Sequence, residues 1–162
     1  MKAIVIYYSL EGNTELVAQE IAKNTGAELF RLVPEKQYPD KGIAKFFWGG
    51  KSVMFGDKPA LKNPVPDLSE FDTVFVGTPV WAGSFAPPLN TFLSGTDLSG
   101  KNVAFFVCCG GGSTEKCFQK LGKAAEGANI LNRLDFVDPR KADPAEVACK
   151  VKNYCSALEL WK

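Results

Sequence analysis

The start of the chain places an uninterrupted apolar run directly before a helical pattern, and this order restricts the fold more than any other feature. Residues 2–8 have the character of a strand that is buried on both faces of a parallel sheet. Apolar side chains then recur at helical spacing at Leu16, Val17, Ile21 and Ala22. Gly26 stands where a left-handed helix cap is favoured. The chain therefore begins with a strand, a tight loop and a helix.

The loop between that strand and helix has the composition of a site for one phosphate. It consists of Ser9, Leu10, Glu11, Gly12, Asn13 and Thr14. Short side chains offer donors, glycine lets the backbone approach closely, and the helix N-terminus presents free N–H groups and a positive dipole end. The loop contains no Lys or Arg, so neutral donors would hold a monophosphate. The same residues also fit a plain tight turn with a helix cap, and both interpretations stay open here.

Two other nucleotide motifs are excluded. A P-loop needs a lysine after its second glycine, and a dinucleotide fingerprint needs three glycines at set intervals; the loop has neither. Glu11 would repel a bound phosphate, so we predict that its side chain turns outward to water.

Length and composition indicate one globular domain. The chain has 162 residues, of which 46% are hydrophobic and 23% charged. We expect a single domain over residues 1–162 with an insertion at about residues 34–66. No apolar stretch is long enough to span a bilayer and no signal-peptide pattern opens the chain, so we expect a cytoplasmic protein without membrane partners.

The titratable residues limit the chemistry that side chains can perform. Histidine is absent, and the five cysteines are not spaced as metal ligands. We therefore predict no metal site and no catalytic side chain, and redox chemistry would need a bound cofactor. Cys109 beside Cys108 admits a reactive thiol, but vicinal cysteines pair only under strain and plain packing is the simpler interpretation.

Strand and helix patterns alternate along the rest of the chain, which is typical of a doubly wound parallel sheet. Further strands are predicted at residues 27–33, 72–78, 102–109 and 129–136. Three helices are predicted: from Pro87 to Leu93; after a Ser113 cap, with Cys117, Leu121 and Ala124 on one side; and after an Asp143 cap, with Val147, Val151, Tyr154 and Leu158 inward. Five strands with flanking helices favour the order 2-1-3-4-5.

Three loops leave this predicted sheet where its strand order reverses, and such edges bind ligands in doubly wound folds. The first is loop 9–14. The second comprises Thr78, Pro79, Val80, Trp81, Ala82, Gly83 and Ser84, which set an aromatic plane among small residues. The third comprises Cys109, Gly110, Gly111, Gly112 and Ser113 and is nearly bare backbone. Flavin mononucleotide (FMN), a flat ring with one phosphate, would use all three, with its ring against Trp81. A tryptophan that plugs the core and an ordinary glycine turn are the alternatives.

Several short segments also resemble the flavodoxin family, and together they span nearly the whole chain. They are Tyr8-Ser9, Gly12-Asn13-Thr14, Val33-Pro34-Glu35-Lys36, Tyr38-Pro39, Gly77-Thr78-Pro79-Val80-Trp81, Thr91-Phe92-Leu93, Leu98-Ser99-Gly100-Lys101 and the glycine loop with Ser113. The resemblance implies a flavodoxin-like α/β fold, a doubly wound five-stranded parallel sheet with helices on both faces. It also implies noncovalent FMN, with Ser9, Gly12, Asn13 and Thr14 at the phosphate, residues 78–83 along the isoalloxazine ring and residues 109–112 at its polar edge.

The insertion at residues 34–66 is not determined by these patterns. Its six lysines exceed its three acidic residues, which predicts a mildly basic face. It also holds Phe46-Phe47-Trp48, the pair Gly49-Gly50 and Met54-Phe55, which is too much apolar surface to leave in water. It is either a short helix and turn that fill the edge of the sheet or a lid over the flavin, hinged at the glycine pair.

We expect an FMN-binding protein that acts in electron transfer or flavin-dependent oxidoreduction, either as a carrier or as an NAD(P)H or quinone oxidoreductase. The net charge of +1 gives weak long-range steering, so the expected partner is a redox protein or a small quinone-like acceptor. The alternative is a module of the same fold that holds another phosphorylated ligand and is not redox active. Scattered lysines balanced by acids argue against nucleic acid. A monomer and a homodimer both remain open.

Overall fold

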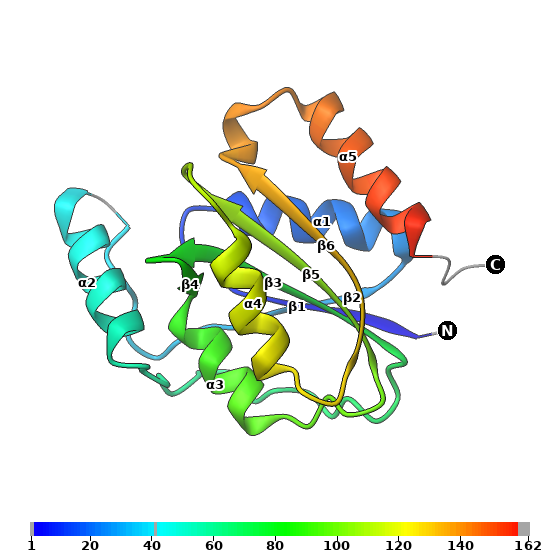
Figure 1. The fold of residues 1–162 in the computed structure, drawn as a ribbon, viewed down its shortest axis with the longest axis horizontal. Helices are drawn as coiled ribbons and strands as arrows, with labels where there is room; N and C mark the ends of the chain where they lie inside the picture. The colour runs from blue at the N-terminus through cyan, green and yellow to red at the C-terminus, as the bar shows by residue number, and fades with distance from the viewer. Residues whose placement is uncertain (1, 41, 159–162) are drawn as a thin grey trace.

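The computed structural model describes residues 2–40 and 42–158, with the side chains of residues 42, 43 and 45–47 outside the description. Among these residues, parallel strands form a central sheet in the order β2-β1-β3-β5-β6 (Figure 1). They are β1 (Ala3–Tyr7), β2 (Glu28–Arg31), β3 (Thr73–Trp81), β5 (Asn102–Cys109) and β6 (Asn129–Val137). A short strand, β4 (Ser84–Phe85), pairs antiparallel with the end of β3. The predicted doubly wound order is confirmed, with β4 as an addition.

Helices cover both faces of this sheet. One face is covered by α1 (Asn13–Thr25) and α5 (Pro144–Ala157), and the other by α3 (Pro87–Gly95) and α4 (Glu115–Ala124). Helix α2 (Gly42–Met54) lies beyond the edge to which the strand arrows point in Figure 1. A 3₁₀ turn, η1 (Pro139–Lys141), joins β6 to α5. None of the described helices has the length and apolar character needed to cross a membrane.

The alternation of side chains along β1 separates two apolar cores. Ile4 and Ile6 face the layer of α3 and α4, whereas Ala3 and Val5 face the layer of α1 and α5. The predicted inward positions after Asp143 are confirmed, because all of them are buried in the second core: Val147, Val151, Tyr154 and Leu158. The central strands β1, β3 and β5 are therefore buried on both faces, as their apolar runs predict, whereas β2 and β6 at the edges are more exposed.

Helix termini follow the predicted capping chemistry in two places. The Asp143 carboxylate accepts the N–H of Ala145 at 2.8 Å, which confirms the N-cap of α5. Gly26 ends α1 with φ +70°, and its N–H donates to the carbonyl of Ala22. These caps fix where the helices of the second core begin and end.

Gly77 is required by the packing of β3 against β5. It lies opposite Phe106 in the register of the two strands, and a Cβ atom at Gly77 would stand 2.0 Å from Cζ of that ring. Phe106 is fully buried, so its ring has little room to move. The phenyl ring thus occupies the space of the missing side chain just before the strand reaches Thr78.

Two predicted elements differ in extent. The second strand was expected over residues 27–33, but only Glu28–Arg31 pair with β1, so it is a short edge strand. The Ser113 cap is wrong by one residue, because α4 begins at Glu115 with Thr114 at its N-cap. The Ser113 hydroxyl instead accepts the N–H of Glu115 at 3.3 Å, a local turn that imitates a cap.

The inward side of α4 is also shifted from the prediction. Cys117 and Leu121 are buried as expected, but Ala124 is exposed. Ala125, four residues after Leu121, takes the buried position instead. Helical spacing of three or four residues allows either alanine, and the position of the helix on the sheet decides between them.

The insertion is built around α2, and its glycine pair is not a hinge. Gly49 and Gly50 both lie inside this helix of 13 residues. Gly49 faces the ring of Trp81, and a Cβ atom there would stand 3.3 Å from Cε3 of that ring. A small residue in α2 therefore lets the helix approach Trp81 closely, and this contact explains the glycine.

The expected burial of the apolar residues of the insertion is wrong for those that the structure describes. Trp48, Met54 and Phe55 are 52%, 77% and 70% exposed. The residues Lys41, Lys45, Phe46 and Phe47, which belong to the predicted basic and apolar surface, lie outside the described side chains. Trp48 lies within α2, and Met54 and Phe55 lie at its end and directly after it, whereas Gly49 and Ser52 of the same helix are buried.

Candidate functional site

The three predicted loops leave the sheet side by side at its carboxyl edge (Figure 1). The N–H of Tyr8 donates to the carbonyl of Gly77 at 3.1 Å, so loop 9–14 starts beside the end of β3. Pro79 is in turn paired with Cys108, directly before the glycine loop. Segments from three distant parts of the sequence thus form one edge.

Loop 9–14 is folded around Gly12. This residue has φ +92°, in the left-handed region that favours glycine, and it is the N-cap of α1. Its N–H donates to Oγ of Ser9 at 3.1 Å. Ser9 and Thr14 are buried, whereas Gly12 and Asn13 are partly exposed. The loop therefore combines buried hydroxyl groups with the free N–H groups of the first turn of α1.

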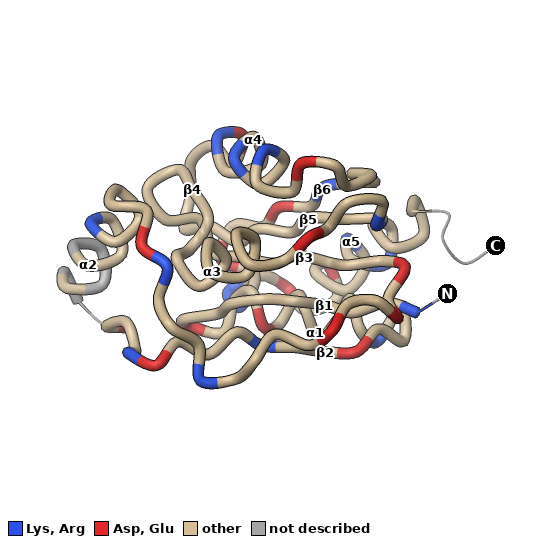
Figure 2. Tube along the Cα trace, turned by 90° about the horizontal axis from the view of Figure 1, so that it is seen from below, with Lys and Arg blue, Asp and Glu red and all other residues tan. Residues whose placement is uncertain are grey.

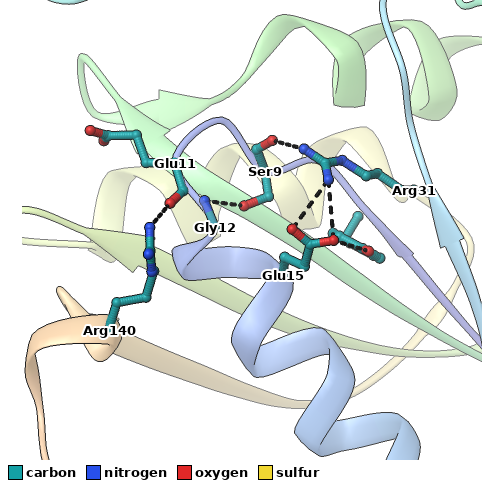
Figure 3. A network of polar contacts seen from close by, with 7 residues as sticks. Ser9, Glu11, Gly12, Glu15, Arg31 and Arg140 are labelled. Carbon is teal, nitrogen blue, oxygen red and sulfur yellow. Dashed lines mark hydrogen bonds and ion pairs between the residues drawn. The ribbon is translucent and has the colours of Figure 1, made fainter. Parts of the chain in front are cut away.

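Arg31 supports this loop from the side of β2, as Figure 3 shows. Its Nη2 donates to the carbonyl oxygen of Ser9 at 2.9 Å, and its Nη1 lies 3.1 Å from both carboxylate oxygens of Glu15. Glu15 belongs to the first turn of α1, where a carboxylate also interacts favourably with the helix dipole. Sequence reasoning assigns Arg31 only to a strand and misses this contact.

Arg140 of η1 supports the same loop from the opposite side. Its backbone N–H donates to Oδ1 of Asn13 at 3.1 Å, and its Nη1 donates to the carbonyl oxygen of Glu11. Figure 3 shows the Glu11 carboxylate directed away from Ser9 and Gly12, in agreement with the predicted outward orientation. A formal positive charge therefore lies against a loop whose own sequence contains none.

Sequence reasoning also misses Arg140, although a signal for it exists. Pro139, Arg140 and Lys141 directly follow β6, and the carboxyl end of every parallel strand lies at the same edge of the sheet. The loops predicted to bind the ligand follow only the first, third and fourth predicted strands. Arg140 follows the last strand and reaches the phosphate side of the same edge.

The segment that follows Thr78 is a hairpin and not the expected loop. β3 continues to Trp81, and the chain then reverses through Ala82 and Gly83 into β4. The two turn residues have φ +48° and +69°, which is the combination found in type I′ hairpin turns. Alanine is uncommon in this conformation, so its presence in the sequence does not predict such a turn. The hairpin holds Trp81 in a paired strand.

Trp81 lies within an aromatic cluster. Its ring centroid is 5.8 Å from that of Tyr8 and 5.2 Å from that of Tyr38, and both pairs meet edge to face. The Tyr8 hydroxyl is buried without a hydrogen-bond partner among the described residues, and burial raises its pKa. Trp81 itself is only partly buried, so a plug inside the core does not describe it.

The glycine loop is open on its outer side. Gly110, Gly111 and Gly112 are exposed, and a Cβ atom at any of them would meet nothing within 4 Å. Gly111 and Gly112 have φ +135° and +86°, which other residues rarely adopt. Cys109, which ends β5, is buried. The loop thus presents backbone to the surface at the edge of the sheet.

Comparison with known proteins decides the family. A family model described as Flavodoxin matches residues 2–134, which include all three loops. The chain belongs to the flavodoxin family. The match ends within β6, so Arg140 lies outside the part of the chain that defines this flavodoxin-family membership.

Solved structures share the flavodoxin fold over most of the chain. A candidate flavoprotein from Bacteroides uniformis is 26% identical, with a TM-score of 0.78 over 96% of this chain and 97% of that one. A second, from Bacteroides eggerthii, is 27% identical, with a TM-score of 0.74 over 91% of this chain and 94% of that one. A flavoprotein from Lactobacillus acidophilus, solved in complex with FMN, is 23% identical, with a TM-score of 0.73 over 86% of this chain and 95% of that one.

The vicinal cysteines of this flavodoxin-family chain are free and buried. Burial raises the pKa of the Cys108 thiol to about 12, although a hydrogen bond with Thr14 opposes the shift. Such a thiol stays protonated at neutral pH, and the thiolate is the reactive form. Cys108 is therefore a packing residue at the end of β5.

Proposed function

We propose that this chain binds FMN noncovalently at the carboxyl edge of its sheet and transfers electrons through the bound flavin. The observation that supports the proposal is the convergence of loop 9–14, the β3–β4 hairpin with Trp81 and the glycine loop 110–112 at one edge. A flat heterocycle with one phosphate is the ligand class that uses all three segments. The FMN complex of the Lactobacillus acidophilus flavoprotein, which has the same fold, also supports it.

The phosphate side fits the donors that are present. Ser9, Gly12, Asn13 and Thr14 would hold the phosphate with two hydroxyls, a carboxamide and backbone N–H groups. The positive end of the α1 dipole adds to these donors. The loop lacks the lysine of a triphosphate-binding motif and the three glycines of a pyrophosphate-binding motif.

The ring side fits the isoalloxazine of FMN. Residues 78–83 would line the ring with Trp81 and the backbone of the hairpin turn. Residues 109–112 would meet its polar edge, because the absence of side chains on the three glycines leaves room for close approach of the backbone. A ligand without a flat ring would leave Trp81 without a function in the site.

The bound flavin would supply the electron-accepting ring, and the chain would set its surroundings. Tyr8, Tyr38 and Trp81 form an apolar wall that limits the access of water. Backbone N–H groups of the glycine loop would stabilise negative charge on the ring. The small residues Ala82 and Gly83 let the turn backbone approach the ring edge. The proposal needs no acid or base from a side chain.

The charge distribution favours a small acceptor or one dedicated partner over long-range steering to many proteins. Lys and Arg are interspersed with Asp and Glu along the chain in Figure 2, and the net charge is only +1. A single-sign surface would accelerate encounters with a partner of opposite charge, and this chain lacks the charge excess for it. We infer a quinone-like molecule or a specific redox protein as acceptor.

Anaerobic stopped-flow spectroscopy with FMN-loaded protein tests the redox role. Reversible bleaching of the flavin band with dithionite and reoxidation by a quinone would support electron transfer. Rapid bleaching by NADPH alone identifies a reductase, whereas bleaching that needs a second protein identifies a carrier. FMN that binds but is not reduced at accessible potentials would contradict the proposal.

A further inference from the structure

We propose that Arg140 positions the phosphate-binding donors of loop 9–14 and so gives this chain its preference for phosphorylated over unphosphorylated flavin. The inference rests on the proposed FMN site and adds a residue beyond the family match, which ends at residue 134. Arg140 acts through two separate contacts, one from its guanidinium and one from its backbone.

The guanidinium contact orients one peptide group of the loop. Arg140 Nη1 donates to the carbonyl oxygen of Glu11, and in a trans peptide the following N–H points the opposite way. That N–H belongs to Gly12 and donates to Oγ of Ser9 at 3.1 Å, on the side of the buried hydroxyls. A cation at the carbonyl end polarises the peptide and makes its N–H a stronger donor. The stronger bond from Gly12 holds the Ser9 hydroxyl, whose own O–H is left to donate to the anion, so Arg140 supports anion binding without touching the anion.

The backbone contact fixes the orientation of the Asn13 side chain. The N–H of Arg140 donates to Oδ1 of Asn13 at 3.1 Å, which assigns the oxygen of the carboxamide to this side. The NH₂ group is then the part of the side chain left to face a ligand, and it is a donor only. A flipped carboxamide would present an oxygen to phosphate and repel it. Arg140 therefore keeps Asn13 in the phosphate-binding orientation.

Arg31 applies the same principle on the other side of the loop. Its Nη2 donates to the carbonyl oxygen of Ser9 at 2.9 Å, so two arginines each donate to one outward carbonyl of the loop (Figure 3). Arg31 is also paired with Glu15, which offsets its charge. Arg140 adds a second positive charge, at the carbonyl oxygen of Glu11.

Arg140 is exposed, but the segment that carries it is attached to the sheet. The N–H of Asp138 donates to the carbonyl of Cys109 at 2.9 Å, and Pro139 is buried, so η1 is attached to the end of β5. Gly12 is fitted to the arginine, because a Cβ atom there would stand 3.3 Å from Nη1 of Arg140. The 3₁₀ turn thus connects the phosphate loop to the strand that carries the glycine loop.

Parallel titrations with FMN and riboflavin, which lacks the phosphate, test the proposal. Arg140→Met keeps most of the apolar stem and removes the charge and the side-chain donor. We expect its Kd for FMN to rise about three- to tenfold at low salt, with little change for riboflavin. This loss should shrink at high salt, because screening weakens the charge that Met removes. Arg140→Lys, which keeps the charge, should recover part of the FMN preference.

Arg133→Met is the matched control. Arg133 is an exposed arginine on β6 that pairs with Glu115 at 2.9 Å, so its removal changes the net charge equally and leaves loop 9–14 intact. We expect both affinities to stay at the wild-type level in this variant. A loss of FMN affinity in Arg133→Met equal to that in Arg140→Met would reduce the effect to overall charge and overturn the proposal.

Two further outcomes would overturn the role of Arg140. One is an equal loss of FMN and riboflavin affinity in Arg140→Met, which indicates a purely structural residue. The other is wild-type affinity for both ligands in Arg140→Met. Where Arg140→Met does not fold, Arg140→Gln repeats the test, since it keeps a donor and loses the charge. Wild-type protein that binds no FMN refutes the proposed function itself, which separates the two failures.

Discussion

Replacement of Gly77 by alanine should destabilise the sheet at the point from which β3 enters the site. The new Cβ would lie 2.0, 2.3 and 2.6 Å from three carbons of the Phe106 ring, whereas carbon atoms in contact are normally about 3.5–4.0 Å apart. Relief needs a shift of more than about 1 Å in a ring that has no exposed surface. Because overpacking typically costs about 1–3 kcal/mol, we expect a loss at or above the upper end, about 3 kcal/mol.

A double-mutant cycle measured by urea unfolding at matched FMN content tests this cause. Phe106→Ala alone should cost about 3–5 kcal/mol, because it removes a buried ring. In the double variant the new methyl group enters the space that the ring leaves, so the Gly77→Ala change should cost little and the coupling should be about 3 kcal/mol. Gly95→Ala is the control, since nothing lies within 4 Å of a Cβ there and its φ is not in the left-handed region. Additive losses, or a cost below about 1 kcal/mol for Gly77→Ala, would refute the packing argument.

Three other predictions concern the edge of the sheet. Gly111→Val should weaken FMN binding at least about tenfold, because φ +135° excludes a branched residue; wild-type affinity in a calorimetric titration would contradict this. Ala82→Gly should raise the free energy of unfolding by up to about 1 kcal/mol by removing strain at φ +48°, and a loss in urea unfolding would argue against strain in the turn. Burial keeps the pKa of Cys108 at about 12 in the folded state against an ordinary value near 9, so the unfolded chain releases this proton first as pH rises. The contribution of Cys108 to the free energy of unfolding should therefore be intact below about pH 9 and fall by about 1.4 kcal/mol per pH unit above it. Equal slopes of unfolding free energy against alkaline pH in wild type and Cys108→Ala would refute this.

The central strands were predictable because β1, β3 and β5 carry apolar runs that are bounded by polar or glycine-rich segments. The same local signals predict the cap at Asp143 and the left-handed Gly26, which depend only on neighbouring residues. The β3–β4 hairpin could not be predicted in this way. It places Ala82 in a conformation that alanine rarely adopts, and the paired strands and not the local sequence hold it there.

The supporting residues of the phosphate loop could not be found from local pattern either. Arg140 lies 127 residues from Asn13 in sequence, and only the sheet topology brings the exits of β1 and β6 to one edge. Arg31 follows the same logic from β2. The donors that would touch a phosphate are short-range features of one loop, whereas the residues that orient those donors come from neighbouring strands. The first kind is readable from sequence and the second needs the fold.

The central claim is that FMN binds beside Trp81 with its phosphate on loop 9–14. Titration of FMN into flavin-free protein, followed by tryptophan fluorescence and by the visible flavin spectrum, tests it most directly. We expect saturable, stoichiometric binding and strong quenching that is lost in Trp81→Phe but kept in Trp48→Phe. Trp48 is the control because it is exposed on α2. A protein that takes up no FMN, or quenching that survives in Trp81→Phe, would contradict the account.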